Sequence, residues 1–383
     1  MEAGNLRKAE ISRALMNKAA RRRIPLSGMF ELTARCNLNC RMCYVRRSEA
    51  QVREMGGELG LNDWLKLAEE AREEGLLFLL LTGGEPFMLP YFKELYTELS
   101  KMGFMITINS NGTMIDEKCV EWLSKIPPSR LRITLYGASE ENYFNLCRQK
   151  GMYERTLKAL DLLKETDILT RVMMTLTPYN VNDYENILRV AEERDMHFQA
   201  SSYIFPPYRR DEKDPGKAVR LSACEAARFT VLSDRRNNDE KGFLNLAEYR
   251  MKQSDSVSDF DDDCMKDEGQ PMRCHAGRST FWINWQGIMT PCGMIPSPAS
   301  EPLKIGFKPA WDEITAKMDE IRLPSKCENC KYSRSCPACG AAIYCETGKF
   351  DEVPAYCCEM AEATDKYTRE MYNEIKQKIE TEN

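Results

Sequence analysis

Histidine is scarce in this sequence, which has only His197 and His275 among 383 residues. Apolar runs of about 20 residues, the length of a membrane-crossing helix, are missing, and no apolar signal-peptide core follows the basic N-terminal segment. The net charge of −5 provides no excess of basic residues for binding nucleic acid. We therefore expect a cytoplasmic protein with neither a membrane nor a nucleic acid among its partners.

Cysteine, in contrast, is abundant, with 16 residues in the chain. Without an export signal, this number argues against disulfides and in favour of metal binding. Cys36, Cys40 and Cys43 form a C-x3-C-x2-C run, and Tyr44 follows it. Three thiolates on one loop can hold three corners of a cubane iron–sulfur cluster and leave one iron open to another ligand. Structural zinc prefers four protein ligands, and this loop offers three cysteines and no nearby histidine.

Apolar and amphipathic segments alternate over residues 29–205, which is typical of a parallel α/β sheet. Parallel strands joined by right-handed helical crossovers predict a curved open sheet or a partial (β/α)6 barrel, with functional residues at the carboxyl ends of the strands. We expect strands at residues 29–34, 76–81, 104–109, 131–136, 170–177 and 197–205, and helices at 62–74, 91–102, 116–125, 153–165 and 183–195.

Short polar segments follow the second, third and fourth of these strands. A Gly-Gly-Glu-Pro segment occupies residues 83–86, an Asn-Ser-Asn-Gly-Thr segment occupies residues 109–113, and a Thr-Leu-Tyr-Gly segment occupies residues 134–137. Glycine pairs allow the backbone to come close to a ligand. Simpler explanations are an ordinary turn for the first segment and a capping turn before the helix at 116 for the second.

The three-cysteine run and the segments behind it resemble the radical S-adenosylmethionine (SAM) superfamily. In that family three cysteines hold a [4Fe–4S] cluster, and SAM chelates the fourth iron. Reductive cleavage of SAM then yields a 5′-deoxyadenosyl radical that removes a hydrogen atom from a C–H bond. The resemblance implies that Cys36, Cys40 and Cys43 are cluster ligands and that the SAM-contacting residues are Tyr44, Gly83, Gly84, Glu85, Asn111, Thr134 and Arg148.

Three positions also have plain structural interpretations. Arg148 can equally be a surface arginine on a helix, and Tyr44 can be a core residue at a strand end. Tyr136 stands where the family commonly has an aspartate, which leaves the local contacts open.

A second group of cysteines lies in the C-terminal part of the chain. Its order, Cys274-x12-Gly-x4-Cys292, then Cys327-x2-Cys330-x5-Cys336-x2-Cys339, then Cys357-Cys358, resembles the SPASM extension of radical SAM enzymes. That extension carries two auxiliary [4Fe–4S] clusters, so the resemblance implies three [4Fe–4S] clusters and SAM as cofactors. Cys119, Cys147 and Cys224 fall in helical patterns and are expected to be buried small apolar residues.

The family pattern assigns the auxiliary ligands in an interleaved order. The first cluster would use Cys274, Cys292 and Cys339, and the second would use Cys327, Cys330, Cys336 and Cys358, with Cys357 as the alternative to Cys358. Cys345 and Cys264 are candidates for a fourth ligand of the first cluster, and the other interpretation is an open iron that binds a substrate thiolate. The role of Cys339 stays open because the spacing Cys336-x2-Cys339 departs from the commoner x3.

The expected domain organisation has five parts. A basic N-terminal helix spans 1–23, the radical SAM partial barrel spans 24–220, and a linker or insertion spans 221–272 and includes an acidic segment at 254–268. The SPASM auxiliary cluster domain spans 273–365, and a C-terminal helix spans 366–383.

SPASM proteins mostly modify ribosomally made peptides, so the leading hypothesis is a peptide maturase that forms a thioether or C–C crosslink or oxidises a side chain. Its expected partners are a peptide substrate and an electron donor such as flavodoxin or ferredoxin. A separate leader-peptide-binding protein is a further candidate partner, because 35 residues before Cys36 are too few for a fused winged-helix domain. No catalytic residue of the chain is assigned, and the substrate and the bond formed stay open.

Three alternatives are kept. Anaerobic sulfatase-type enzymes, which make formylglycine, resemble this layout but place an aspartate after the cysteine that matches Cys292, where this chain has Gly293. Radical oxidation or decarboxylation of a small molecule, such as a sugar or tetrapyrrole, is the second. An iron–sulfur electron carrier is the third, and it does not account for the Gly-Gly-Glu-Pro segment or the three-cysteine loop.

Overall fold

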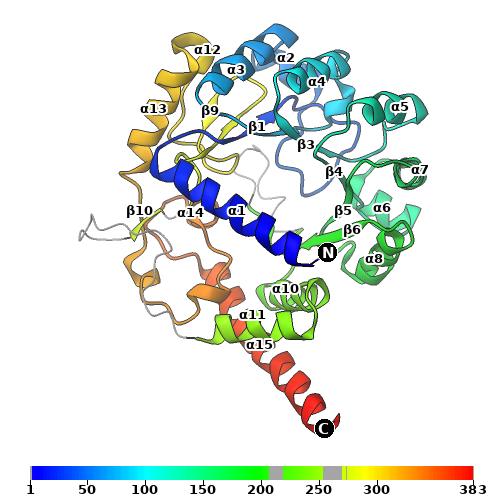
Figure 1. Ribbon diagram of the computed structural model, residues 1–383, viewed down its shortest axis with the longest axis vertical. Helices are drawn as coiled ribbons and strands as arrows, with labels where there is room; N and C mark the ends of the chain where they lie inside the picture. The colour runs from blue at the N-terminus through cyan, green and yellow to red at the C-terminus, as the bar shows by residue number, and fades with distance from the viewer. Residues whose placement is uncertain (1, 207–218, 253–269, 273, 383) are drawn as a thin grey trace.

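The computed structural model describes residues 2–206, 219–252, 270–272 and 274–382. Its main feature is a curved eight-stranded sheet in the order β6-β5-β4-β3-β2-β1-β8-β9 (Figure 1). The first six strands along the chain are parallel neighbours, which confirms the predicted partial barrel. They are β1 (Ser27–Glu31), β2 (Phe78–Thr82), β3 (Met105–Ser110), β4 (Arg130–Thr134), β5 (Thr170–Thr175) and β6 (His197–Ser201).

Helices between these strands cover the outer face of the sheet. Strand residues alternate between the two faces, so that Leu131 and Ile133 of β4 are fully buried against the helices while their neighbours face the lumen. The crossover helices are α3 (Leu61–Glu73), α4 (Phe92–Lys101), α5 (Glu117–Lys125), α7 (Met152–Lys164) and α8 (Tyr184–Glu192), each close to its predicted range. Two shorter helices were given no predicted range: α2 (Glu49–Glu54), whose six residues show too little periodicity, and α6 (Glu140–Cys147), where only a helical pattern around Cys147 was expected.

The cysteine-rich half of the chain continues the same sheet. Strand β8 (Thr280–Ile283) pairs in parallel with β1, and β9 (Met289–Thr290) pairs antiparallel with β8. The close approach needs Gly28, because a Cβ atom there would lie 2.4 Å from Cζ of the Phe281 ring. From the sequence we expected the barrel and the cysteine-rich part to be separate domains. In the structure, the pairing of strand β1 with strand β8 joins them in one sheet.

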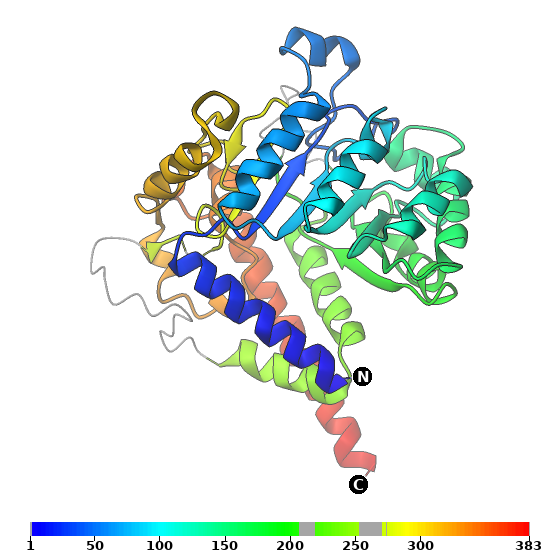
Figure 2. The same cartoon turned by 45° about the horizontal axis from the view of Figure 1, so that its top comes forward.

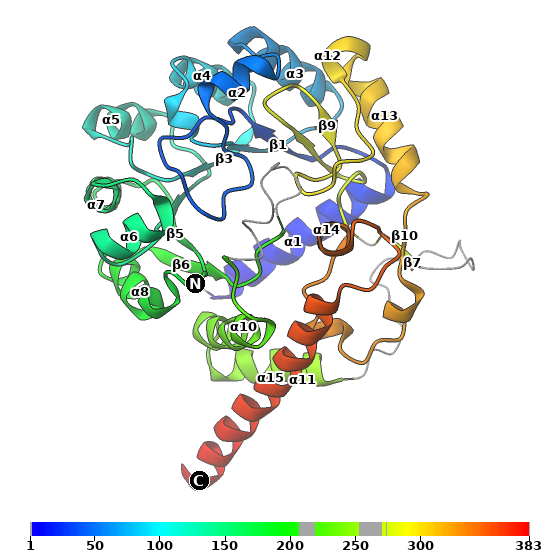
Figure 3. The ribbon, with the colours of Figure 1, turned by 180° about the vertical axis from the view of Figure 1, so that it is seen from behind.

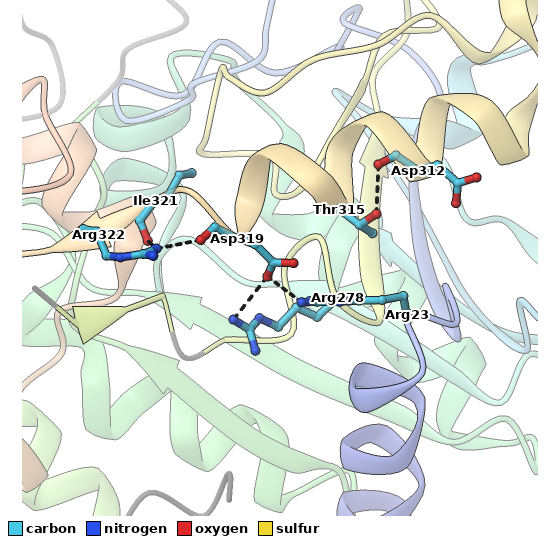
Figure 4. A network of polar contacts seen from close by, with 7 residues as sticks. All are labelled: Arg23, Arg278, Asp312, Thr315, Asp319, Ile321 and Arg322. Carbon is cyan, nitrogen blue, oxygen red and sulfur yellow. Dashed lines mark hydrogen bonds and ion pairs between the residues drawn. The ribbon is translucent and has the colours of Figure 1, made fainter. Parts of the chain in front are cut away.

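Helix α1 (Glu2–Arg21), expected within residues 1–23, crosses the ring of elements at the end where the strands begin (Figures 1 and 2). Its C-terminal end is fastened to α13 (Phe307–Met318): the Trp311 indole N–H donates to the Arg23 carbonyl at 2.6 Å. The Arg23 guanidinium also pairs with Asp319, which lies 3.6 Å from Arg278 (Figure 4). These contacts connect the start of the chain to its cysteine-rich half.

Three further helices gather at one end of the molecule (Figure 3): α10 (Ala223–Asn237), α11 (Glu240–Met251) and α15 (Ala355–Glu382). They bury a small core of their own around Val231, Phe243 and Ile375. The linker expected at 221–272 is thus mostly helical where the structure describes it. The C-terminal helix, expected to begin at 366, begins at Ala355. The acidic segment 254–268 and residues 207–218 lie outside the described residues. Cys224 was expected to be buried, but it is exposed on α10 because that helix turns another face to α15.

The remaining elements are short. They are β7 (Gln270–Pro271), paired with β10 (Arg322–Leu323), and the helices α12 (Pro302–Ile305) and α14 (Gly340–Thr347). No helix in the described ranges has both the length and the apolar character needed to cross a membrane.

The Trp311 contact gives a first prediction. Trp311→Phe keeps an aromatic ring but removes the hydrogen bond to the Arg23 carbonyl, so the free energy of unfolding should fall by about 1–3 kcal/mol. Urea denaturation of the two proteins measures this. The control is Trp122→Phe, at a half-buried position where no hydrogen bond of the indole is recorded. Equal effects of the two substitutions would contradict a role for the hydrogen bond.

Candidate active site

The carboxyl ends of the six parallel strands open on a cavity of about 380 Å³. Residues from the loops after β1, β2 and β3 and from the ends of β4, β5 and β6 line it, as the strand order requires. Eight of the predicted site residues lie on its wall: Cys36, Cys40, Cys43, Tyr44, Gly83, Gly84, Asn111 and Thr134. The prediction did not include several other wall residues, notably Asn109, Tyr136, Thr175, Ser201, Tyr203, Phe205 and Met294.

Backbone and side-chain N–H groups surround two of the three loop sulfurs. The Leu38 N–H points at the Cys36 sulfur at 3.4 Å, and the Asn111 amide lies 3.6 Å from the same sulfur. The Arg46 N–H lies 3.3 Å from the Cys43 sulfur. Donors of this kind stabilise negative charge on thiolates and tune an iron–sulfur centre. The donor set therefore fits a thiolate-ligated cluster.

The pKa values of two of the loop thiols are raised. Burial raises the pKa of the Cys36 thiol well above its usual value. The largest cause that raises the pKa of Cys40 is a contact with the Cys147 thiol, and burial is the second largest. Within the described ranges, no three or more histidine, cysteine, aspartate or glutamate side chains converge on one metal-ion position. Cys147 is a neighbour that the sequence did not reveal, because it reaches Cys40 from the end of α6.

The two glycines after β2 allow the β2 loop to pack on the loop after β1. A Cβ atom on Gly84 would lie 2.2 Å from the carbonyl oxygen of Arg35, and one on Gly83 would lie 2.6 Å from that of Thr33. Two backbone hydrogen bonds join the loops there, from Gly84 N–H to Thr33 O at 2.7 Å and from Glu85 N–H to Arg35 O at 3.0 Å. The sequence pointed to close approach to a ligand, and the structure adds a steric requirement from the neighbouring loop.

Glu85 lies behind the cavity wall. Its carboxylate is fully buried and accepts hydrogen bonds from the Ser110 hydroxyl at 2.9 Å and the Asn111 N–H at 2.8 Å. Burial raises the pKa of Glu85 to about 7. Asn111 in turn donates to the Asn37 side chain at 2.9 Å, beside Cys36. Glu85 therefore positions Asn111 and links the loops after β1, β2 and β3.

Arg148 does not reach the cavity. It is exposed at the C-terminal cap of α6 in the left-handed conformation, with φ 57°, which directs the chain away from the strand ends. Arg148 thus lies where the surface interpretation puts it, and the SAM contact implied by the resemblance stays a prediction.

Four cysteines of the C-terminal half gather beside the cavity. The pKa of Cys274 is raised to about 11, mainly by burial and to a smaller extent by the neighbouring Cys339 and Cys292 thiols. Burial raises the pKa of Cys345 to about 12, again with contributions from Cys292 and Cys339. The Cys345 thiol contacts the carbonyl of Met294 at 3.4 Å, and Met294 lines the cavity. Cys264, the other candidate for this group, lies outside the described residues.

A second group of four contains Cys327, Cys330, Cys336 and Cys358. Burial raises the pKa of Cys336 to about 11, and the thiols of the other three raise it further. Cys358 is exposed on the first turn of α15, whereas the adjacent Cys357 is fully buried. Cys357 turns towards Tyr203 and Glu346. Successive helical residues point about 100° apart, so the two thiols of the pair face different surroundings.

A buried ion pair that the sequence did not predict lies behind Tyr203 of the cavity wall. Arg220 and Glu346 pair at 2.5 Å, and the Tyr203 hydroxyl donates to the same carboxylate at 3.0 Å. The Arg220 guanidinium also lies over the Tyr356 ring, 3.7 Å from its centroid. Each of these contacts joins residues more than 100 positions apart along the chain, so local patterns carry no signal for it.

The glycine contact gives a second prediction. Gly84→Ala places a methyl group against the Arg35 carbonyl, so the two loops must separate, and the reductive cleavage of SAM should fall at least tenfold. Gly103→Ala is the control: its Cβ meets no atom within 4 Å, and only the positive φ of +89° costs about 1–2 kcal/mol of stability. Full activity in Gly84→Ala would show that the close loop contact is dispensable.

Comparison with known proteins places these features in a family. The radical SAM superfamily profile matches residues 30–191. AdoMet-dependent heme synthase of Methanosarcina barkeri is 26% identical over 338 residues, 86% of this chain and 95% of that protein. The sporulation killing factor maturation protein SkfB of Bacillus subtilis is 22% identical over 308 residues, 80% of this chain and 69% of that protein.

A solved structure shows the same fold. SuiB of Streptococcus suis bound to S-adenosylmethionine superposes with a TM-score of 0.64 at 17% identity, over 93% of this chain and 81% of that chain. The cofactors of the superfamily are a [4Fe–4S] cluster and SAM. Residues 30–191 thus form a radical SAM domain, and the chain is an enzyme of the radical SAM superfamily.

Proposed function

We propose that this protein is a SPASM-type radical SAM maturase that holds three [4Fe–4S] clusters and removes hydrogen from a residue of a ribosomally made peptide. The product would be a thioether or C–C crosslink or an oxidised side chain. The observation that carries the proposal is the presence of three separate cysteine groups, one on the cavity wall and a second in contact with it through Met294. Three thiols lie on the loop after β1, and two groups of four lie in the half of the chain that extends the same sheet.

Cys36, Cys40 and Cys43 would hold the cluster that binds SAM. When bound, the cluster and SAM supply the radical that removes the hydrogen atom. The chain contributes the surroundings: the loop N–H groups compensate the thiolate charge, and Asn111 and Thr134 provide polar contacts on the wall. Aromatic side chains from the end of β6 close another side and restrict water.

Cys274, Cys292, Cys339 and Cys345 would hold the first auxiliary cluster, and Cys327, Cys330, Cys336 and Cys358 the second. Met294, two residues after Cys292, lines the cavity and also contacts Cys345. The first group is therefore next to the substrate space, where a cluster can accept the electron that a substrate radical loses. The electron that starts the reaction would come from a flavodoxin- or ferredoxin-type donor in a reducing cytoplasm.

Two comparisons support a peptide substrate. SkfB is named as a maturation protein, and SuiB has been solved with its precursor peptide SuiA. Leader recognition would use the barrel itself or a separate peptide-binding protein. Formylglycine formation fits less well, because a Cβ atom on Gly293 would lie 2.8 Å from the Trp282 ring and leaves no room for an aspartate.

Radical oxidation or decarboxylation of a tetrapyrrole is the second candidate. The observation that favours it is the 26% identity to a heme synthase over 95% of that protein's length. A short open reading frame beside the gene would favour the peptide. Incubation of that peptide with the reduced enzyme and SAM should then remove hydrogen atoms from it, which mass spectrometry detects, while conversion of a tetrapyrrole instead would overturn the peptide proposal.

The cluster loop gives a third prediction. The anaerobically reconstituted protein, reduced with dithionite, should release 5′-deoxyadenosine from SAM, and Cys40→Ala should abolish the release because it removes one cluster ligand. Liquid chromatography measures the product. Cys119→Ala, at a buried cysteine of α5, is the matched control and should retain activity. SAM cleavage by Cys40→Ala would show that the assignment of this loop is wrong.

The cysteine pair gives a fourth prediction. Three [4Fe–4S] clusters correspond to about twelve irons per chain, and Cys358→Ala should lower this towards about eight by disrupting the second auxiliary site. Cys357→Ala should leave the iron content unchanged, because the Cys357 thiol faces Tyr203 and Glu346. Iron analysis and the visible absorption spectrum measure both. Loss of iron in Cys357→Ala but not in Cys358→Ala would show that Cys357 is the ligand.

A further inference from the structure

Three arginines line the inner wall of the partial barrel below the SAM cavity. Arg130 and Arg132 lie on β4, and Arg171 lies on β5. Side chains alternate along a strand, so Arg132 shares a face with Thr134, which lines the cavity, and not with the buried Leu131. Arg171 shares a face with another cavity residue, Thr175, by the same alternation. All three arginines therefore face the lumen.

The sheet register places the arginines side by side. Asn109, Arg132, Arg171 and His197 occupy one row across β3, β4, β5 and β6. Neighbouring strands are about 4.8 Å apart, and two residues along a strand span about 7 Å. The row thus lies one inward-facing layer below Thr134, and it begins at Asn109, which is itself part of the cavity wall.

Among the described side chains, none of the three guanidinium groups has an acidic partner. The Nε atom of each of the three arginines is buried without a hydrogen-bond partner, and no ion pair is recorded for any of them with the described part of the chain. Burial lowers the pKa of Arg132 and Arg171, and the neighbouring arginine charges lower both further. Burial and the charges of Arg171 and Arg130 also lower the pKa of His197. The row holds cations that repel one another.

An arrangement of this kind is costly unless an anion compensates it, because a desolvated charge without a partner destabilises the fold. The buried guanidinium of Arg220, in contrast, is paired with Glu346. Destabilising groups are retained where a ligand needs them. The planar guanidinium group matches a carboxylate through two parallel hydrogen bonds.

We propose that Arg132 and Arg171, with Arg130 below them, form a subsite that binds a carboxylate group of the substrate in the lumen next to the SAM cavity. This inference rests on the proposed function, since it assigns part of the substrate to that enzyme. The carboxylate comes from an acidic side chain or C-terminus of a peptide, or from a small carboxylic acid. A carboxylate from either source accepts the same two parallel hydrogen bonds from a guanidinium group.

The experiment compares three probes on the anaerobically reconstituted full chain: a hexaglutamate peptide, a hexaglutamine peptide and coproporphyrin III, which carries carboxylates on a small molecule. Isothermal titration calorimetry measures binding to wild type, Arg132→Gln, Arg171→Gln and the control Arg228→Gln, an exposed arginine of α10. The first two variants should weaken binding of a carboxylate probe at least tenfold, as expected for the loss of a charge-assisted pair. The control should bind like wild type.

The carboxylate probe that binds identifies the source, and hexaglutamine should not bind. Each lumen variant should still release 5′-deoxyadenosine from SAM and melt no lower than wild type, because it removes an uncompensated charge. If neither carboxylate probe binds, if the control loses binding equally, or if the variants lose SAM binding or melt several degrees lower, the subsite is overturned. Failure of the proposed function is separate and appears as wild-type protein that does not cleave SAM.

Discussion

The contact on which the site depends is the packing of the loop after β2 against the loop after β1. Gly83 and Gly84 leave no space between these loops for even a methyl group, and the backbone hydrogen bonds there fix their separation. One loop carries the three cysteines, and the other leads into Glu85, which holds Asn111 from the third loop. A rigid cavity wall therefore arises from backbone packing before any ligand binds, which is the preorganisation that radical chemistry requires.

A second constraint is that both halves of the chain share one sheet. Because β8 pairs with β1, the position of Cys292 relative to the cluster loop is set by strand register and not by a flexible linker. The Trp311 and Arg23 contacts and the Arg220–Glu346 pair close the arrangement from two other sides. The cluster loop and the first C-terminal cysteine group are thus held next to the same cavity.

Much of the barrel follows from local patterns. Buried strands such as β2 are continuous apolar runs, and amphipathic helices such as α4 show their period clearly, so their ranges were predicted within a few residues. The short helix α2 was missed because its six residues are too few to show a helical repeat of apolar positions. For Arg148 the motif left a SAM contact and a surface position open, and its exposed place at the left-handed cap of α6 depends on a backbone conformation that residue order does not encode.

By itself, the sequence indicated the chemistry, because the spacing of Cys36, Cys40 and Cys43 is that of a loop that can ligate three irons. The spacing is informative because all three cysteines lie on one short loop. Tertiary structure decided what depends on contacts between distant segments. It grouped Cys345 with Cys292, placed Cys358 near Cys330 and Cys357 beside Tyr203 and Glu346, and set Arg132 next to Arg171. Strand register and helix orientation set these neighbours, and both are fixed only when the whole sheet is packed.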